Sequence, residues 1–326
     1  MSSDSAVERF AEFVAILGRG PGRSRALTRE EGREALGMML DGEPDPHQVG
    51  AVLMLLRYRG EDAEELAGMV EAARERAALL GPAAALDWPS YGSGRTRGAP
   101  WFLLSALALA RSGVRVLMHG SNAFSSGVSV AEGLLALDMA PARNAVEASG
   151  LLARHRFAYF PLAALSPPLE RLLGLRRLFG LRSPVNTVAR LLNPADAPAG
   201  IDGVFHPGYI DVHLAVAERM GRERLLVLKG GGGEAECNPR KPVAAHFWQK
   251  GGGRSEVLLP AASGLEPLRQ EENAELLAAM WRGEVTSPLA IATIQATIAA
   301  ALLALGQVNA PEAAEAAARE IWLARA

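Results

Sequence analysis

The sequence has a single cysteine, Cys237, so an internal disulfide is excluded; this fits a reducing cytoplasm. The first residues carry no basic segment followed by an apolar run, so no secretory signal is expected. The most apolar stretch, Leu289 to Leu305, is interrupted by Gln295 and two threonines, and it is slightly short for a membrane span. We therefore expect a cytoplasmic protein with no membrane partner, in which this stretch is a buried helix.

Lysine is also scarce, because 31 of the 34 basic residues are arginine. The net charge of −2 conceals an uneven distribution. From Arg143 to Arg190 there are eight arginines and only two acids, Glu147 and Glu170, whereas acids are concentrated in the first 80 residues and near the C-terminus. A basic middle indicates an anionic ligand or polymer held in a groove. The alternative is that the arginines reflect only a biased composition, and that folding distributes their charges over the surface.

Length and composition describe an ordinary globular chain. The 326 residues are 49% hydrophobic and 21% charged, which suits two unequal lobes around substantial cores. Residues 1–81 read as four helices with capped starts at Thr28, Asp45 and Asp62. We therefore predict a small N-terminal helical domain over residues 1–81.

After Gly81-Pro82 the pattern changes to short apolar strands that alternate with helices. Strands are expected at 84–87, 114–118, 157–160, 203–205, 225–228 and 256–259, and helices at 101–111, 130–137, 209–220, 273–281 and 289–305. This alternation predicts an α/β fold with a mostly parallel central sheet. Residues 165–193 have no strand signal and are read as a helical segment that returns to the small domain. The large α/β domain is then formed by residues 82–164 and 194–326.

Two loops of this domain suit phosphate. One is the glycine loop from Tyr91 to Gly98, which contains Gly92, Gly94, Arg95 and Arg97, and the other runs from His119-Gly120 to Ser125-Ser126. Both follow predicted strands and are expected at one rim of the sheet, where backbone N–H groups and a helix N-terminus can hold an anion. The simpler reading is that both loops are only tight turns.

The order of these pieces resembles the anthranilate phosphoribosyltransferase family, a glycosyltransferase family with the nucleoside-phosphorylase-like phosphoribosyltransferase fold. The resemblance covers nearly the whole chain and is carried by Leu55 to Glu61, His119-Gly120 with Ser125-Ser126, Leu191 to Pro194, His206-Pro207 and Glu271 to Ala274. It implies a small helical-bundle domain joined to a larger α/β domain. In the family, phosphoribosyl pyrophosphate and magnesium are held by a Gly-Thr-Gly-Gly-Asp loop, an Asn-x-Ser-Thr segment, a Lys-His-Gly-Asn loop and an Asp-Glu pair.

Most of those ligands differ here. The first loop has no aspartate, and the Asn-x-Ser-Thr segment falls on the four residues Pro100 to Leu103. Met118 occupies the position of the family's loop lysine, and Ser121 occupies the position of its asparagine. The acidic pair falls on Ala235 and Glu236, so Glu236 and the nearby Glu234 are the remaining candidates for a metal. Whether the chain is an enzyme is therefore uncertain, and Mg²⁺ is expected only if transferase activity survives.

A narrower branch, the nucleic-acid-binding paralogues of the YbiB type, is most similar. The shared motifs are Pro89 to Tyr91, Pro167 to Glu170, Gly180 to Ser183 and Gly233 to Arg240. The resemblance implies a homodimer with a basic groove that binds single-stranded DNA or RNA without sequence preference. No cofactor is expected for that activity. We expect the N-terminal helical domain to form the dimer, because isolated helical lobes often bury apolar stripes against a second copy. The residues predicted to contact nucleic acid or phosphate are Arg95, Arg97, His119, Ser125, Ser126, Arg176, Arg177, Arg182, Arg190, Arg240 and Lys241, with glycine loops at Gly92, Gly94, Gly120, Gly231 and Gly233.

Several alternatives stay open at this point. The chain could be a phosphoribosyl- or pentosyltransferase with an altered substrate, or a sensor of a small anionic metabolite. Tyr91 is a candidate for stacking on bases, whereas Trp101 and Phe124 are expected to pack in the core. His119 is either a packed turn residue or part of the binding rim.

Overall fold

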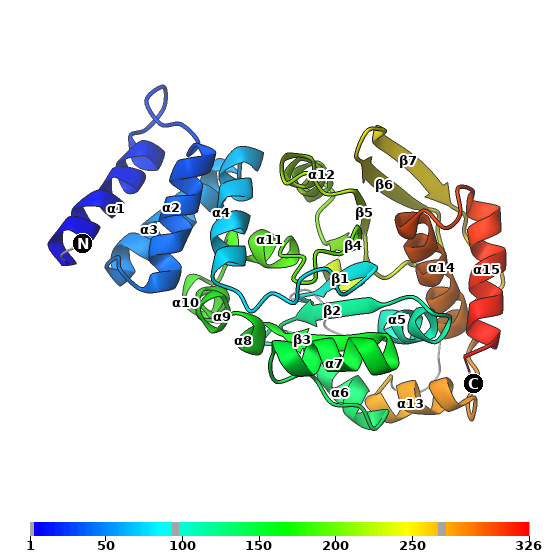
Figure 1. Cartoon of the computed structure of the whole chain (residues 1–326). Helices are drawn as coiled ribbons and strands as arrows, with labels where there is room; N and C mark the ends of the chain where they lie inside the picture. Colours follow the sequence, from blue (N-terminus) through cyan, green and yellow to red (C-terminus); the bar gives the residue numbers. More distant parts are fainter. Residues whose placement is uncertain (1–2, 93–97, 125, 267–271, 326) are drawn as a thin grey trace.

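A twisted seven-stranded sheet lies at the centre of the larger part of the chain (Figure 1). The computed structural model describes residues 3–92, 98–124, 126–266 and 272–325. The strands are β1 (Leu86–Ser90), β2 (Val116–Gly120), β3 (Phe157–Pro161), β4 (Ala199–Val204), β5 (Arg224–Lys229), β6 (Val243–Gln249) and β7 (Gly253–Leu259), in the order β3-β2-β1-β4-β5-β6-β7. Strands β1 to β5 are parallel, and β6 and β7 add an antiparallel hairpin. The predicted fold class is confirmed.

Two strand predictions needed correction. Strand β4 begins at Ala199 instead of Gly203, because Gly200 and Gly203 weaken the local strand signal although both lie in the paired segment. A Cβ on Gly203 would lie 2.0 Å from the backbone of Glu234, so close backbone approach requires glycine there. The prediction omitted β6, whose pairing with β5 and β7 joins residues far apart in sequence.

Helices cover both faces of the sheet. They are α5 (Trp101–Arg111), α6 (Val130–Ala136), α7 (Ala145–His155), α12 (Tyr209–Arg219), α13 (Ala274–Arg282), α14 (Pro288–Leu305) and α15 (Pro311–Leu323). Alternate strand residues enter two separate cores: Leu226 faces the core of α5 and α14, whereas Val227 faces the core of α12. Helix α14 is long and apolar enough to span a membrane, but most of it is buried against the protein's own core, as expected for an internal helix.

The N-terminal helices form a bundle beside the sheet (Figure 1). They are α1 (Ser3–Gly18), α2 (Arg29–Asp41), α3 (Pro46–Arg59) and α4 (Ala63–Glu75). The predicted caps Thr28, Asp45 and Asp62 each form a capping box, which satisfies N–H groups that a helix start leaves unpaired. Local sequence therefore defines where three of these helices begin.

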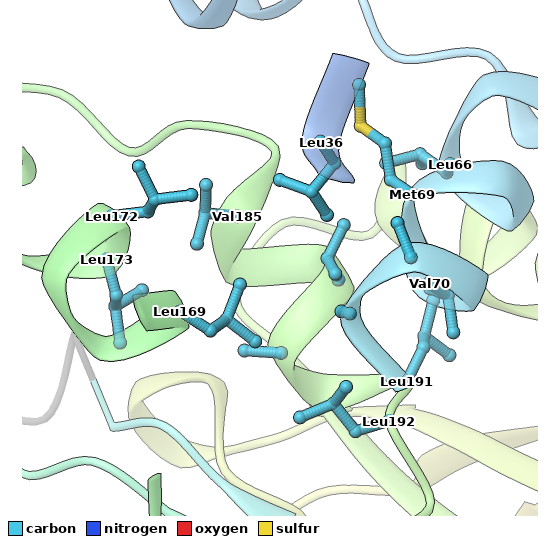
Figure 2. Packing of buried hydrophobic residues seen from close by; sticks show 14 of the residues in the cluster. Leu36, Leu66, Met69, Val70, Leu169, Leu172, Leu173, Val185, Leu191 and Leu192 are labelled. Carbon is cyan, nitrogen blue, oxygen red and sulfur yellow. The ribbon is translucent and has the colours of Figure 1, made fainter. Parts of the chain in front are cut away.

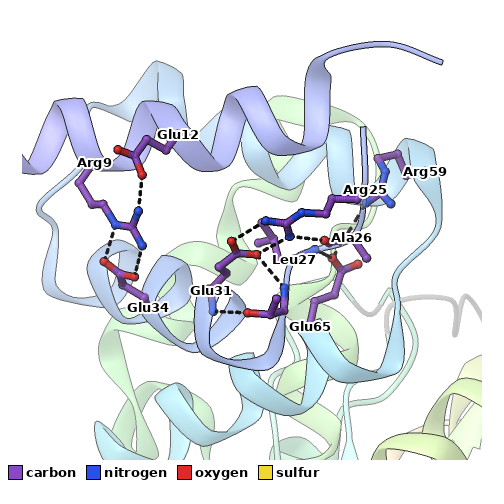
Figure 3. A network of polar contacts seen from close by, with 10 residues as sticks. Arg9, Glu12, Arg25, Ala26, Leu27, Glu31, Glu34, Arg59 and Glu65 are labelled. Carbon is purple, nitrogen blue, oxygen red and sulfur yellow. Dashed lines mark hydrogen bonds and ion pairs between the residues drawn. The ribbon is translucent and has the colours of Figure 1, made fainter. Parts of the chain in front are cut away.

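Polar contacts tie the bundle's helices together (Figure 3). Arg9 of α1 bonds Glu34 of α2 at 2.6 Å, and Arg25 bonds Glu31 at 2.6 Å. Glu65 of α4 is fully buried and accepts hydrogen bonds from the N–H groups of Leu27 and Asp62, both at 2.8 Å. These two backbone donors satisfy the carboxylate, and the Arg59 guanidinium lies 4.0 Å from it, which compensates its burial.

A helical segment returns from the sheet to the bundle. It comprises α8 (Leu162–Leu165), α9 (Pro167–Gly174), α10 (Arg176–Phe179) and α11 (Val185–Arg190). Leu169, Leu173, Val185 and Leu191 belong to the same core as Leu36, Leu66 and Met69 of the bundle (Figure 2). The division of the chain into 1–81 with 165–193, and 82–164 with 194–326, stays a prediction.

Candidate nucleic-acid interface

The carboxyl ends of the parallel strands define the candidate site. In an open α/β sheet, ligands bind beyond these ends. Tyr91 follows β1, Phe124 lies in the loop after β2, and Phe205 follows β4. Helices α10 and α11 bring arginines toward this edge, and α3 contributes Arg57 from the bundle.

These arginines form what we call the arginine cluster, namely Arg57, Arg176, Arg177, Arg182 and Arg190. Burial, followed by the positive charges of Arg190, Arg176 and Arg57, lowers the pKa of Arg182 to about 10. Burial also lowers the pKa of Arg176. Guanidinium groups from α3 and from a segment more than a hundred residues later are therefore close enough to repel one another, and an anion between them would relieve this repulsion.

Aromatic rings accompany the cluster. The guanidinium of Arg176 lies 4.9 Å from the centre of the half-buried Phe124 ring, and that of Arg177 lies 5.8 Å from it. Arg182 lies 5.5 Å from the ring of Phe205, which is 43% exposed. Phe124 packs against the hydrophobic core, as expected, and remains partly accessible in the loop after β2. Trp101 is buried, as expected.

A cavity of roughly 60 Å³ opens between Arg57, Arg182 and Arg190. Its wall includes His213, whose Nδ1 lies 2.7 Å from the buried carboxylate of Asp202. Tyr209 also lines the cavity, and its hydroxyl donates to Glu61 at 2.9 Å and accepts a hydrogen bond from Arg57. Burial, followed by the Glu61 charge, raises the pKa of Tyr209 to about 12. The cavity has room for one phosphate-sized group beside three cations.

Arg190 is more deeply placed than an exposed phosphate contact would be. It is 6% exposed, and its guanidinium donates to the carbonyl oxygens of Tyr91 at 2.9 Å and Asn186 at 3.2 Å. Burial lowers its pKa, which the nearby charges of Glu234 and Asp202 offset in part. Arg190 therefore stabilises the loop after β1 through its hydrogen bond to Tyr91, and it adds a buried positive charge to the arginine cluster.

The structure corrects the expectation that His119 belongs to an exposed binding rim. His119 is fully buried, with Nδ1 2.8 Å from the Tyr91 hydroxyl and Nε2 3.2 Å from Asp87. Asp87 in turn bonds Arg222 at 3.0 Å. Burial opposes ionisation of Asp87, but the charges of His119 and Arg222 together lower its pKa. Strand β2 aims this side chain into the domain, so the alternative of a packed residue holds.

At some of the predicted glycines the backbone leaves no room for a side chain or has a conformation that favours glycine. A Cβ on Gly120 would lie 1.8 Å from the carbonyl oxygen of Ser90 on the paired strand. Gly233 has φ +85°, a left-handed conformation that favours glycine, and ends the short 3-10 turn η1 (Gly231–Gly233). Gly92 is buried and Gly231 is exposed. Gly94, Arg95, Arg97 and Ser125 lie outside the described residues.

The N-terminus of α5 is occupied by carboxylates of the chain itself. Glu236 accepts a hydrogen bond from the N–H of Phe102 at 3.0 Å. Glu272 accepts from the N–H of Ala99 at 3.0 Å and from the indole N–H of Trp101 at 3.1 Å. This is the place where the glycine-loop-to-helix pattern predicted an external anion, and two side-chain carboxylates satisfy these donors instead.

One of the two metal candidates, Glu236, caps the start of α5 in this structure. Glu236 is buried and directed at α5, and Glu234 is also buried. Within residues 3–92, 98–124, 126–266 and 272–325, no group of three or more His, Cys, Asp or Glu residues could hold a metal ion. A magnesium role for Glu234 and Glu236 remains a prediction tied to the transferase alternative.

Three other predicted residues are exposed. Ser126 lies in the loop before α6, and Arg240 and Lys241 lie in the turn before β6. Cys237 is buried, and burial raises the pKa of its thiol, so it is not an activated nucleophile.

The sequence alone did not point to Arg57, Phe205, Tyr209 or His213 as site residues. A signal existed for two of them, since Arg57 lies in the basic last turn of α3 and Phe205 immediately follows a strand. Nothing local marked Tyr209 or His213, because their partners are distant in sequence.

The fold and site define a two-part α/β protein of the phosphoribosyltransferase type, with a cationic edge and a self-capped helix at the expected anion position. Family models match residues 12–77 (glycosyl transferase family, helical bundle domain) and residues 102–322 (glycosyl transferase family, α/β domain). The chain therefore belongs to this glycosyltransferase family, glycosyltransferase family 3, which contains the anthranilate phosphoribosyltransferases.

Relatives agree with this assignment. Anthranilate phosphoribosyltransferase of Myxococcus xanthus is 32% identical over 302 residues, covering 89% of this chain and 88% of the relative. An uncharacterised protein of Escherichia coli, YbiB, is 29% identical over 275 residues, covering 82% and 85%. The crystal structure of anthranilate phosphoribosyltransferase from Thermus thermophilus matches with a TM-score of 0.79 and 25% identity, covering 98% of this chain and 95% of that one. The Saccharomyces cerevisiae enzyme, solved with phosphoribosyl pyrophosphate and magnesium, matches in fold at 16% identity and a TM-score of 0.77, covering 98% and 94%.

Proposed function

We propose that this protein binds single-stranded DNA or RNA without sequence preference at the arginine cluster. The observation that carries the proposal is the convergence of Arg57, Arg176, Arg182 and Arg190, whose mutual repulsion contributes to lowering the pKa of Arg182 to about 10. At neutral pH this group is still protonated, so the cluster presents several cations to a phosphate backbone.

Phe124 and Phe205 add a second element of recognition. A base stacked on an aromatic side chain contributes about 1–3 kcal/mol irrespective of its identity. Both rings already lie beside arginine side chains, at 4.9 Å from Arg176 and 5.5 Å from Arg182. A strand could therefore contact cations through its phosphates and aromatic rings through its bases, which favours single strands over duplex.

The state of the α5 N-terminus supports a function other than phosphoribosyl transfer. Glu236 and Glu272 neutralise the donors that would face a diphosphate, and an incoming diphosphate would meet their negative charges. The residues at the family's Asn-x-Ser-Thr segment begin with Pro100-Trp101-Phe102, and Trp101 and Phe102 are buried. The scaffold is retained while its sugar-phosphate ligands are replaced.

Fluorescence anisotropy with a labelled oligothymidylate across a salt series tests the proposal. We expect saturable binding that weakens steeply as salt rises, because each neutralised phosphate releases a counterion. Arg182→Gln should weaken binding about tenfold and reduce the slope of log K against log salt by roughly 0.7. Arg319→Gln, a substitution of an exposed arginine on α15, serves as the matched control and should bind as wild type.

Phe205→Leu separates stacking from charge. It should weaken binding while leaving the salt slope unchanged, because no cation is removed. Absence of binding at low salt, or equal affinity at all salt concentrations, would refute the proposal. Loss of affinity in Arg319→Gln equal to that in Arg182→Gln would show that the cluster is not the site.

The second candidate is a phosphoribosyl- or pentosyltransferase with an altered substrate. It is favoured by the identity of 32% to the Myxococcus enzyme across most of the chain. In that case Mg²⁺ would be needed, with Glu234 and Glu236 as its protein ligands, and Glu236 would have to leave the Phe102 N–H. Calorimetry with phosphoribosyl pyrophosphate and magnesium should then show saturable heat, and absence of heat at high ligand concentration would exclude this candidate.

We also propose that the protein acts in the cytoplasm as a homodimer formed through the N-terminal helices. Val7 of α1 is 36% exposed, and Tyr58 of α3 is 91% exposed next to Arg57. A partner copy packed on these helices would cover this apolar surface and place two arginine clusters on one particle.

A further inference from the structure

A second cavity lies at the opposite end of the parallel strands from the arginine cluster. It has a volume of about 500 Å³ and opens between the C-terminal ends of α5 and α7, the start of β3, and α13. Figure 1 shows these elements grouped on the side of the sheet away from the helical bundle. Pockets of this size, about 300–1,000 Å³, are typical of small-molecule sites.

Three arginines line this cavity, namely Arg111, Arg154 and Arg156. In the described part of the chain, none of the three forms an ion pair with a carboxylate. Arg154 and Arg156 belong to the basic stretch that was predicted to line one groove, but the fold places them at this second cavity. The arginine excess is thus divided between two ends of the sheet, and the proposed nucleic-acid site leaves this half unexplained.

The arginines of this cavity face several negative neighbours. Asp138 lines it, and α5, α6, α7 and α13 all end at its wall, where each C-terminal end contributes about half a negative charge. The three arginines offset these neighbours, with His155 also at the wall. Their guanidinium groups are the donors that would hold an anion in the cavity.

Apolar groups form the rest of the wall. Leu107, Met139 and Phe157 line the interior, and Trp281 of α13 adds an indole ring. The Arg111 guanidinium lies 5.9 Å from the centre of that ring. A flat apolar group could rest against Trp281 while its anionic end meets Arg111.

The backbone at this cavity is held in an uncommon conformation. Asp138 has φ 57° and Arg156 has φ 56°, two of the four described non-glycine residues with positive φ. Left-handed conformations of such residues cost about 1–2 kcal/mol and persist where the surroundings fix them. The carbonyl of Arg156 accepts the N–H of Val116 at 2.8 Å, so the neighbouring strand anchors this arginine.

We propose that this cavity binds a small anion with a flat apolar ring, such as an aromatic acid or a nucleoside monophosphate. The ring would pack between Trp281 and the aliphatic wall, and the anionic group would be held by Arg111, Arg154 and Arg156. This site is independent of the nucleic-acid proposal, because it shares no residue with the arginine cluster.

Anilinonaphthalene sulfonate is a suitable probe, because it combines flat rings with one anionic group and fluoresces when it leaves water. We expect one saturable site per chain. Arg111→Gln and Arg154→Gln should each weaken the probe about tenfold, and Ala140→Trp should abolish binding by filling the mouth from an exposed position. Arg182→Gln and Arg319→Gln are the controls and should leave the probe affinity unchanged.

The uncharged analogue N-phenylnaphthylamine tests the role of charge. The wild type should bind this analogue more weakly than it binds the sulfonate. The analogue should bind Arg154→Gln as tightly as it binds the wild type. Displacement of the sulfonate by benzoate or by adenosine monophosphate then distinguishes an aromatic acid from a nucleotide as the ligand class. Absence of saturable binding, or binding that Ala140→Trp and Arg154→Gln leave intact while circular dichroism shows folded protein, would overturn the proposal.

Discussion

At the scale of single residues, buried charge is concentrated on the sheet face that looks toward α12. Asp87 lies there between His119 and Arg222 and contacts both, and Asp202 and His213 form a second pair. Burying an ion is costly unless its partners remain, so the removal of one partner leaves an uncompensated charge. These residues hold the strands and the Tyr91 loop in place below the arginine cluster.

Asp87→Asn tests this interpretation. The substitution keeps the shape but leaves Arg222 and His119 without their anion, so we expect a loss of about 3–5 kcal/mol in the free energy of unfolding. Urea denaturation followed by circular dichroism measures it. Asp45→Asn is the control, because asparagine caps a helix as well as aspartate does; an equal loss in both variants would contradict the assignment.

Glu170 gives a pH-dependent prediction. Burial raises the pKa of this carboxyl, although a hydrogen bond from Ser121 at 2.8 Å opposes the shift. Folding therefore favours the protonated form of Glu170. The stability that this form contributes is fully present below the usual pKa of 4.5 and is lost as pH rises through the raised pKa. Glu170→Gln should stabilise the protein by about 1 kcal/mol near neutral pH and by progressively less in acid.

Thermal unfolding at several pH values measures the Glu170 effect. Glu147→Gln is the matched control, since a hydrogen bond from Arg143 lowers the pKa of Glu147. Glu147→Gln should therefore destabilise the protein near neutral pH, because ionised Glu147 stabilises the fold above its unfolded pKa. A Glu170→Gln variant that is less stable than wild type at neutral pH would contradict the prediction.

At the scale of elements, close helix packing shapes the bundle. Gly68 of α4 faces α2 so closely that a Cβ would lie 1.9 Å from the carbonyl oxygen of Arg29. Gly32 of α2 makes the reciprocal approach, with the Glu65 carbonyl oxygen at 2.5 Å. Glycine at both positions lets the two backbones meet.

Gly68→Ala should therefore destabilise the protein by about 1–3 kcal/mol or more, because the helices must separate. Gly174→Ala in α9 is the control: nothing lies within 4 Å of the added Cβ, and alanine is the better helix former. Denaturant midpoints should move in opposite directions. A neutral Gly68→Ala would show that α2 and α4 are not tightly packed in solution.

At the scale of the whole molecule, the proposed homodimer is tested by chromatography with light scattering. Wild type should elute with twice the chain mass. Tyr58→Asp and Val7→Asp should shift it toward monomer, because each places a charge in the proposed interface. Val146→Asp on α7, where the side chain is 82% exposed in the other part of the molecule, is the control. A monomeric wild type would exclude the dimer.

Much of the fold follows from short-range patterns. The capping boxes at Thr28, Asp45 and Asp62 determine helix starts because each involves residues three apart. Alternating apolar residues identified the central strands β2, β3 and β5 within a few residues. Strand β6 was missed because its identity depends on pairing with β5 and β7, which local sequence does not encode.

The sequence by itself determined the α/β architecture, the capped helices and the surplus of arginine in the middle of the chain. Tertiary structure alone decided where those arginines lie. It brings Arg57 to Arg182 and Arg190, and it sends Arg154 and Arg156 to the other end of the strands. It also directs Glu236 and Glu272 to the start of α5. Spacing along the chain encodes contacts within a few residues, whereas these neighbours meet only when the sheet and its covering helices have formed.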